Sequence, residues 1–468
     1  MSERPASYRE VLAVGEFRAL FGAHVASLLG DQAAKVALAI LVLTRSDSPL
    51  LAALAYAVGY LPWIVGGPVL SPLADRRPRR DVMVRCDLVR AVAVAAMAVP
   101  GTPLWLLFAL LLGSSLLMPP FEAARAATLP DVLTGDRYVV ASSLSSITNQ
   151  LCQVAGFVLG GAAVVALSPR GALLADAASF ALSAALIAGG VKWRPAADRE
   201  GRPTLRADLV EGARVVFRSP VLRSILLLAW FGAAFAVVPE GLAVTYARRL
   251  GWGPLATGLL TAASPAGLVA GALLIGRLTA PRTRLRLMLP LAAFAFVPLV
   301  LTAAHPPLWA AALLWAASGF GTAYQLPANA TFMLAVPPEA RGRAFGLAQS
   351  GIQALQGVAL AGGGALALAL EPHVVVAIAG LAGLAAVGLL TLTWPHGELA
   401  ALHAPAPEDE SLGDMTFGDV PLEPPVPVLP ELALQRWMGP YQLRPRPRTL
   451  LVRLVRDRSA TPDSSARR

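Results

Sequence analysis

Charged residues and cysteines are scarce in this sequence. Asp, Glu, Lys and Arg make up only 15% of its 468 residues, whereas a soluble protein carries about 25%. So few charges leave too little polar surface to cover a globule in water, which argues against a soluble protein. The two cysteines, Cys86 and Cys152, both lie in apolar stretches, so neither a disulfide framework nor a cysteine metal site is indicated.

Motifs for nucleotide, zinc and serine chemistry are also missing. The sequence has no phosphate-binding loop ending in Gly-Lys-Ser or Gly-Lys-Thr, no HExxH zinc motif and no GxSxG nucleophile turn. An enzyme in the membrane would need a nucleophile, a base and an orienting residue at one depth, and no such cluster stands out. We therefore expect no enzymatic activity, no metal and no cofactor.

Long hydrophobic runs dominate instead. Hydrophobic residues make up 56% of the sequence, and the mean hydropathy is +0.61. A helix needs about 20 apolar residues to cross the hydrocarbon core of a bilayer. The sequence therefore predicts twelve membrane-spanning helices, at residues 17–43, 50–73, 82–99, 103–122, 142–166, 171–191, 222–247, 255–278, 287–304, 308–333, 344–370 and 373–394.

The positive charge is arranged by side of the membrane. The net charge is +10, and Lys35 and Lys192 are the only lysines. Arginines gather in alternate loops, such as 76–80 and 282–286, and are rare in the other loops, where Arg248 and Arg249 form the one cluster. Because Lys and Arg concentrate on the cytoplasmic side, we predict a multi-pass cell-membrane protein with both termini in the cytoplasm. The same arrangement accounts for the basic charge without nucleic acid.

Composition divides the chain into five regions. The polar run after Lys192 separates two groups of six spans, and past Pro395 the chain becomes rich in Pro, Glu and Asp, which is typical of disorder. The predicted regions are a cytoplasmic N-terminus at 1–16, an N-terminal six-helix bundle at 17–191, a cytoplasmic central loop at 192–221, a C-terminal six-helix bundle at 222–394 and a cytoplasmic, largely disordered tail at 395–468.

The two groups of spans resemble each other at an offset of about 203 to 205 residues. Matched positions include Arg18 with Arg223, Ser114 with Ser318, and Gly160-Gly161 with Gly363-Gly364. Parallel repeats of this kind build transporters in which two halves rock about a central site. We therefore expect an all-α integral membrane protein of two pseudosymmetric six-helix bundles, with a substrate site between them near the bilayer midplane.

One cytoplasmic loop carries a known family pattern. Residues 71–80, Ser-Pro-Leu-Ala-Asp-Arg-Arg-Pro-Arg-Arg, resemble the loop between the second and third helices of the major facilitator superfamily, Gly-x-Leu-Ala-Asp-Arg-x-Gly-Arg-Arg/Lys. Asp75, Arg76, Arg79 and Arg80 fall on its charged positions, while other residues replace its two glycines. The resemblance implies a conformational role for these four residues. Asp75 would face a helix end, and the arginines would hold the loop against anionic headgroups or only orient the protein.

Other stretches narrow the resemblance, which covers about residues 15–395. Leu29-Gly30-Asp31 and the run 120–125 (Pro-Phe-Glu-Ala-Ala-Arg) are similar to the branch that includes macrolide-efflux and enterobactin-exporter proteins. The fourth predicted helix lacks the arginine, and the fifth lacks the Gly-Pro pair, that many drug–proton antiporters carry.

Ionisable residues within spans are candidates for coupling or gating, because burying a charge in the bilayer is costly. Asp31 and Lys35 lie one turn apart on the first span, where they would form either a structural ion pair or part of the coupling path. Lys35 aligns with Glu240 across the repeat. We hypothesise that Lys35 and Glu240 meet across the cavity as an extracellular gate. Asp87 with Arg90 and Glu122 with Arg125 have the spacing of structural pairs, and Asp176 that of a cap.

Amide and aromatic side chains on the spans are candidates for lining a substrate cavity. They would either bind substrate or form hydrogen bonds and packing between helices. The candidates are Tyr56, Tyr60, Asn149, Gln153, Trp230, Tyr324, Gln325, Asn329, Gln353 and Gln356.

These features together predict a secondary transporter that works by alternating access. The expected activity is export of an amphipathic small molecule, such as a drug, antibiotic or siderophore, driven by a proton gradient. Import of a metabolite, transport of lipids or lysolipids, and a non-transporting membrane sensor are the alternatives. The expected partners are the small-molecule substrate and the lipid bilayer, with no nucleic acid, and the protein is expected to be a monomer.

Overall fold

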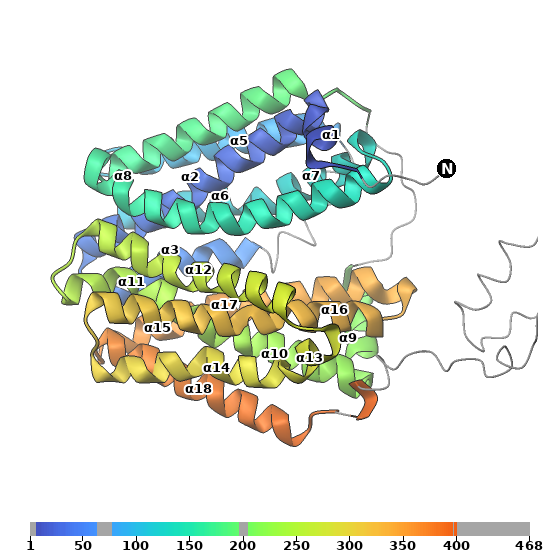
Figure 1. Ribbon diagram of the computed structural model, residues 1–468. Coiled ribbons are helices and arrows are strands. Elements are labelled where there is room, and N and C mark those ends of the chain that lie inside the picture. The colour runs from blue at the N-terminus through green and yellow to red at the C-terminus, as the bar shows by residue number, and fades with distance from the viewer. Residues whose placement is uncertain (1–5, 63–76, 196–204, 396, 400–468) are drawn as a thin grey trace, which may run out of the picture. The chain divides into compact units, whose positions relative to one another are not determined.

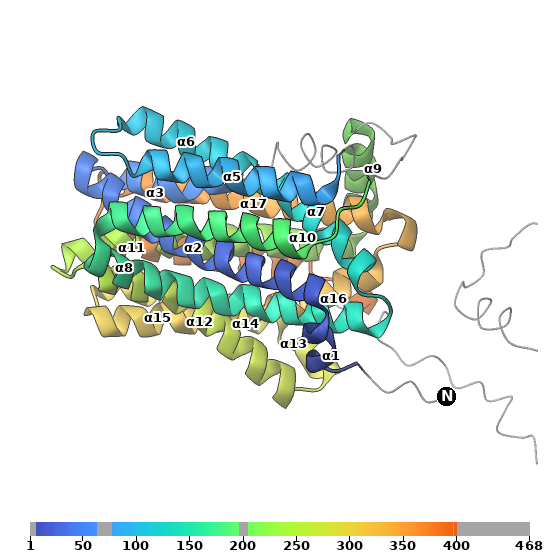
Figure 2. The ribbon, with the colours of Figure 1, turned by 90° about the horizontal axis from the view of Figure 1, so that it is seen from above.

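The computed structural model describes residues 6–62, 77–195, 205–395 and 397–399, which contain helices and no strand. Most of the long helices run along a common direction, as two views show (Figures 1 and 2). Helices of the first half of the chain gather in one group and helices of the second half in another (Figure 1).

The first group contains two of the longest helices in the described chain. Its long helix α8 contains two spans, because Ser168, ahead of Pro169, has a left-handed φ of 72° that breaks the helix. Proline lacks the N–H needed to continue the helical ladder. The helices are α1 (Tyr8–Ala13), α2 (Gly15–Ser46), α3 (Pro49–Ala57) with the 3-10 turn η1 (Val58–Tyr60), α5 (Arg79–Met97), α6 (Leu104–Leu116), α7 (Met118–Val132) and α8 (Asp136–Gly190).

The second group follows a short amphipathic helix. That helix, α9 (Leu205–Arg218), lies in the region predicted as a central loop and packs against α17 and α10. The remaining helices are α10 (Pro220–Ala236), α11 (Val238–Arg249), α12 (Pro254–Leu278), α13 (Pro281–Arg286), α14 (Met288–Leu301) with η2 (Thr302–Ala304), α15 (Leu308–Gly321) with η3 (Thr322–Tyr324), α16 (Gln325–Ala335) after which η4 (Pro338–Ala340) leads into α17 (Arg341–Leu366), and α18 (Pro372–Leu392).

The predicted spans correspond to these helices. Two shorter apolar helices cover Pro49–Tyr60 and Met288–Ala304, and α5, α15 with α16, and α17 supply further spans. The predicted all-α membrane fold of twelve spans in two bundles is confirmed. Six stretches are long and apolar enough to cross a membrane by length and composition alone, namely Gly15–Ser46, Leu104–Val132, Asp136–Gly190, Pro220–Arg249, Pro254–Leu278 and Pro372–Leu392.

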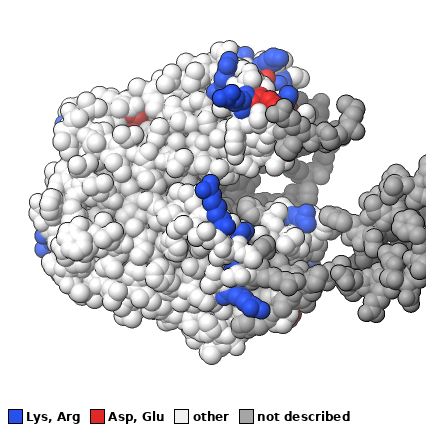
Figure 3. Space-filling model, in the orientation of Figure 1, with Lys and Arg blue, Asp and Glu red and all other residues white. Residues whose placement is uncertain are grey.

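Basic side chains are scarce over the middle of the surface shown in Figure 3. In Figure 3 the Lys and Arg side chains gather mainly at the right-hand end, where α2 begins, and most of the rest of the face carries no charge. Such an uncharged belt beside a basic end is typical of a protein held in a bilayer.

Helix breaks occur at equivalent positions in the two halves. The fourth span breaks where α6 gives way to α7 at Met118, just before Pro119 and Pro120, and the tenth breaks at Thr322–Tyr324. These breaks lie at the offset of the sequence repeat, which shows that the repeat extends to local structure. Proline and 3-10 turns are the usual causes of such breaks.

The glycine pairs of the repeat hold equivalent contacts. A Cβ on Gly161 of α8 would lie 2.6 Å from the Pro254 carbonyl oxygen of α12, and a Cβ on Gly364 of α17 would lie 2.6 Å from Ala53 Cβ of α3. Each contact joins one half of the protein to the other. Only small residues allow backbones to approach this closely, so these glycines fix two equivalent crossings between the halves.

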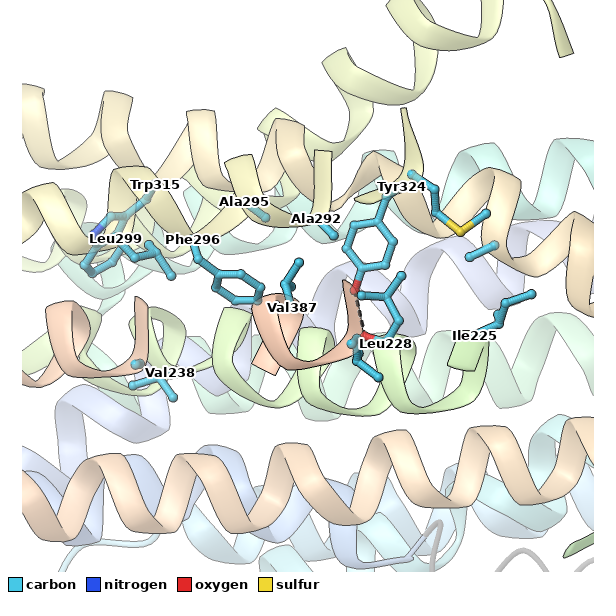
Figure 4. Close-up of a cluster of buried hydrophobic side chains, with 14 of the residues drawn as sticks. Ile225, Leu228, Val238, Ala292, Ala295, Phe296, Leu299, Trp315, Tyr324 and Val387 are labelled. Carbon is cyan, nitrogen blue, oxygen red and sulfur yellow. Dashed lines mark hydrogen bonds between the residues drawn. The ribbon is translucent and has the colours of Figure 1, made fainter. Parts of the chain in front are cut away.

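A continuous apolar core holds the second half together. Phe296, Leu299 and Trp315 are fully buried in it, and Figure 4 shows them between helices with Val387. Tyr324 lies in the same core, and its hydroxyl donates to the Leu228 carbonyl oxygen at 3.2 Å (Figure 4). The tyrosine thereby ties η3 to α10.

Parts of the predictions lie outside the described residues or stay untested. Residues 63–73 of the second predicted span, Asp75, Arg76 and nearly all of the predicted tail at 395–468 lie outside the described residues. The predicted domain boundaries therefore stay predictions.

Candidate functional site

A cavity of about 250 Å³ lies between the two halves. Most of its lining comes from α2, α3, α5 and α8 of the first half, whereas Glu240 and Gln353 come from the second half. A second cavity of about 160 Å³ shares Tyr60, Gln153 and Glu240 with the first, so the two adjoin. The repeat predicts a site in this position.

Asp31 and Arg90 form the strongest ion pair in the cavity. The Arg90 Nη2 donates to Asp31 Oδ2 at 2.6 Å, although these residues lie on different helices, α2 and α5. The guanidinium of Arg90 is almost fully buried and stacks 4.0 Å from the centre of the Phe180 ring. Arg90 is therefore fixed by a charge-assisted hydrogen bond and a cation–π contact together.

Two more carboxylates surround this arginine. Asp87 Oδ1 lies 3.9 Å from Arg90 Nη1, and Asp87 Oδ2 accepts a hydrogen bond of 2.5 Å from the Ser183 hydroxyl. Asp176 is buried, lines the cavity and accepts from the Ser179 hydroxyl at 3.1 Å. The predicted pair of Asp87 with Arg90 thus exists only as a longer contact, and Asp176 faces the cavity.

Lys35 and Glu240 face the same cavity from opposite halves. The Lys35 Nζ donates to Gln32 Oε1 at 2.6 Å, and both Lys35 and Glu240 are among the lining residues. Within the described chain, no ion pair of 4.0 Å or less joins Lys35 to Glu240 or to Asp31. The structure therefore brings the hypothesised gate pair to one cavity without a direct contact.

Acids outnumber bases around the cavity. Asp31, Asp176 and Glu240 line it, against Lys35 and Arg90, and Asp87 adds another acid behind Arg90. A carboxylate withdrawn from water is costly unless it is paired or protonated. The cavity therefore favours the uptake of a proton or a cationic group.

Six of the predicted cavity side chains do line the two cavities. Tyr56 and Gln353 line the first, Gln325 and Gln356 the second, and Tyr60 and Gln153 both. Together they offer phenol rings and amides, which suit a ligand with both apolar and polar parts. Their role in binding stays a prediction.

Four other candidates lie elsewhere. Tyr324 is buried in the core, and the Trp230 indole donates to the Ala348 carbonyl oxygen at 3.0 Å. Asn149 bonds to His24, and Asn329 is exposed away from both cavities. The polarity of a side chain on a span does not reveal which face of the helix meets the cavity, so the sequence did not separate these four from the rest.

The described arginines of the family loop pattern bond within the first half. The Arg79 Nη1 donates to the Ala127 carbonyl oxygen at 2.7 Å and to Asp131 Oδ2 at 2.6 Å, and Arg80 donates to the Ala188 carbonyl oxygen. These contacts tie the start of α5 to α7 and to the end of α8. Their role in conformational change stays a prediction.

Sequence reasoning missed two features of the site. It treated Arg90 as part of a local pair, although an arginine inside the apolar run 82–99 signals a functional residue by itself. It did not consider His24, which is buried and bonded to Asn149. Within the described residues, no group of three or more His, Cys, Asp or Glu side chains is arranged to hold a metal ion.

The two halves are also linked at the end of the molecule where α2 ends. The Arg248 Nη2 of α11 bonds to Asp47 Oδ1, just after α2, at 2.5 Å. The neighbouring Arg249 pairs instead with Glu371 of its own half, Nε to Oε2, at 3.6 Å. Arg248 and Arg249 were the exception to the predicted concentration of arginines in alternate loops. Arg248 thus bridges the halves, whereas Arg249 does not.

Comparison with known proteins agrees with this architecture. The chain is 27% identical over 388 residues to the uncharacterized MFS-type transporter YfiS of Bacillus subtilis, a match that covers 80% of this chain and 91% of that protein. It is 22% identical over 173 residues to macrolide efflux protein A of Streptococcus pyogenes, over 34% of this chain and 43% of that protein.

Solved structures share the fold. The nucleoside transporter NupG superposes with a TM-score of 0.66 at 12% identity, over 81% of this chain and 99% of that one. A bacterial homolog of the human lysosomal transporter Spinster, in an inward-facing and unoccupied conformation, superposes with a TM-score of 0.60 at 16% identity, over 86% of this chain and all of that one. Residues 20–303 and 241–458 match the Major Facilitator Superfamily. The chain therefore belongs to this superfamily of membrane transporters.

Proposed function

We propose that this transporter exports an amphipathic small molecule across the cell membrane by alternating access, in exchange for protons. Both termini would lie in the cytoplasm, as the distribution of arginines favours, and one chain would suffice because the cavity is built from its two halves. The proposed substrate class includes drugs, antibiotics and siderophores.

The excess of acids around the cavity carries this proposal. Asp31, Asp176 and Glu240 face one enclosed space together with the cations Lys35 and Arg90. When the substrate is absent, a proton removes the cost of the unpaired carboxylate. When the substrate arrives, it would displace that proton, and this competition is the simplest physical basis for exchange.

The lining supports an amphipathic substrate. Tyr56, Tyr60 and Phe157 offer apolar ring surface, while Gln153 and Gln353 offer amides. The similarity to macrolide efflux protein A favours export over import, although it covers only part of both chains.

Transport into inverted membrane vesicles tests the proposal. We expect ethidium, tetraphenylphosphonium or erythromycin to accumulate when a proton gradient is imposed and to leak out again when an uncoupler is added. Asp31→Asn should lower the accumulation about tenfold or more, since an intramembrane carboxylate cannot be replaced by an amide in proton transfer.

Other outcomes would replace the proposal. Uptake by right-side-out vesicles alone would indicate an importer, and movement of labelled lysolipid alone would indicate a lipid transporter. No gradient-driven movement of any of these compounds would contradict proton-coupled export and favour a sensor.

A further inference from the structure

A layer of polar side chains lies next to the cavity in the first half, and His24 is its buried member. His24 of α2 is only 5% exposed. Its Nε2 lies 2.6 Å from Asn149 Oδ1 of α8, and its Nδ1 lies 3.8 Å from Glu122 Oε1 of α7. Glu122 in turn accepts a hydrogen bond of 2.7 Å from Arg125 Nη2. Three helices thus converge on one histidine.

This layer lies just beyond the lining of the cavity. His24, Glu122 and Asn149 each lie one helical turn from a residue that lines the cavity. Four residues span about 6 Å along a helix. In each of the three helices, the step from the lining residue to the layer leads toward the end of the molecule at which α2 begins. The lining residues in question are Leu28, Met118 and Gln153, respectively.

His24 also lies in register with Asp31. The two residues are seven positions apart on α2, so they share one face of the helix. Their separation along the axis is about 10 Å, which water in the cavity can bridge. The histidine therefore stands between Asp31 and the end of the protein where the chain begins.

The hydrogen bonds of His24 leave one nitrogen ready for a proton. An amide oxygen only accepts hydrogen bonds, so the contact with Asn149 Oδ1 places a hydrogen on Nε2. The lone pair of the neutral ring is then on Nδ1 and faces the Glu122 carboxylate. Two acceptors oppose each other there, and a proton on Nδ1 would turn the contact into a charge-assisted one.

We propose that His24 carries protons between Asp31 and the cytoplasmic solvent, an inference that rests on the proposed proton exchange. The step starts when Asp31 has separated from Arg90 and taken up a proton. That proton then leaves the Asp31 carboxyl through cavity water and binds His24 Nδ1, which gives an imidazolium beside Glu122, and the Asp31 carboxylate can pair with Arg90 again. The same N–H then releases the proton to cytoplasmic water, and the ring is neutral again. The charged groups that face His24 are Glu122 and Arg125 of α7 and Asp31 of α2.

The test separates proton movement from substrate binding. Purified protein in liposomes is assayed with ethidium, tetraphenylphosphonium and erythromycin for gradient-driven accumulation and for counterflow, which needs no net proton movement. The variants are His24→Gln, which keeps an N–H toward Asn149 but cannot titrate, and His305→Gln, which alters an exposed histidine away from both cavities.

We expect His24→Gln to lower gradient-driven accumulation about tenfold, while counterflow stays within about twofold of the wild type. The driven rate should also lose its dependence on pH over the range of about 5 to 8 in which histidine titrates. His305→Gln should keep both activities.

Each remaining outcome contradicts the role of His24. If the wild type accumulates substrate and His24→Gln retains its rate and pH profile, the proton passes elsewhere and only this inference is wrong. If His24→Gln loses driven transport and counterflow equally, the histidine is structural. If the wild type shows counterflow without any gradient-driven accumulation, the proposed proton exchange itself is wrong and the role of His24 with it.

Discussion

Arg90 compensates two acids beside the cavity, Asp31 and Asp87. It bonds to Asp31, approaches Asp87 and stacks on Phe180 while nearly all of its surface is buried. Removing one partner from a buried charge network leaves the other partner uncompensated, which costs about 3–5 kcal/mol. We therefore predict that Arg90→Met lowers the free energy of unfolding by this amount, as measured by denaturation in mixed micelles.

The adjoining surface supplies a matched control for this change. Arg85 lies on the same helix but is exposed, so Arg85→Met should change stability by less than about 0.5 kcal/mol. Adding Asp31→Asn to Arg90→Met should recover part of the loss, because it removes an unpaired carboxylate. Equal stability of Arg85→Met and Arg90→Met would show that the buried ion pair is dispensable.

Sequence alone predicted a coupling or gating role for Asp31, Lys35 and Glu240, which stays a prediction, and it did not predict the partner of Asp31. Helical spacing relates residues on one helix, so it suggested that Asp31 pairs with Lys35. The partner of Asp31 is Arg90 on another helix, and the contact depends on how α2 and α5 pack. Periodicity carries no information about that packing, which is why ion pairs between helices were not predictable.

Among the helices, α8 touches both halves at neighbouring glycines. A Cβ on Gly161 would meet α12 at 2.6 Å, whereas a Cβ on Gly189 of the same helix would meet nothing within 4 Å. Overpacking a tight contact costs about 1–3 kcal/mol. We predict that Gly161→Leu lowers the free energy of unfolding by about this amount and that Gly189→Leu leaves it nearly unchanged.

Titration of the detergent-solubilised variants with SDS would measure both free energies of unfolding, so that Gly161→Leu and Gly189→Leu can be compared. Similar losses in the two variants would mean that α8 and α12 separate easily and that the crossing does not hold the halves together.

The helices themselves were far more predictable than their irregularities. Apolar length located the spans, and the repeat aligned Gly160 and Gly161 with Gly363 and Gly364 as equivalent positions. The break of the tenth span at Thr322–Tyr324 and the helix α9 in the central loop were not foreseen. The first depends on packing around η3, and the second on contacts with α10 and α17, so neither is a property of local composition.

Across the whole molecule, an exposed ion pair helps to keep the two halves together at one end. Arg248 and Asp47 are 56% and 77% exposed in their side chains, and exposed pairs contribute about 1 kcal/mol at most. Asp47→Asn should therefore favour separation of the halves at this end by about fivefold or less, and high salt should abolish the difference. The separation can be measured with a Gln153→Cys reporter in a variant that lacks Cys86 and Cys152. We expect a thiol reagent added from outside to label this cysteine faster when Asp47 is replaced.

The neighbouring pair is a built-in control. Arg249 and Glu371 have similar exposure but belong to the same half, so Glu371→Gln should not change the labelling rate. Equal acceleration by Glu371→Gln would mean that general surface charge, and not the bridge between halves, controls access.

The near-absence of lysine has a practical consequence. Lys35 lines the cavity, and Lys192, the other lysine, lies exposed near the end of α8. The wild-type chain thus carries one primary side-chain amine in the cavity and one outside it. Acylation of these two amines, compared by mass spectrometry, would report how often the interior opens to a reagent, with Lys192 as an internal reference and without any engineered label.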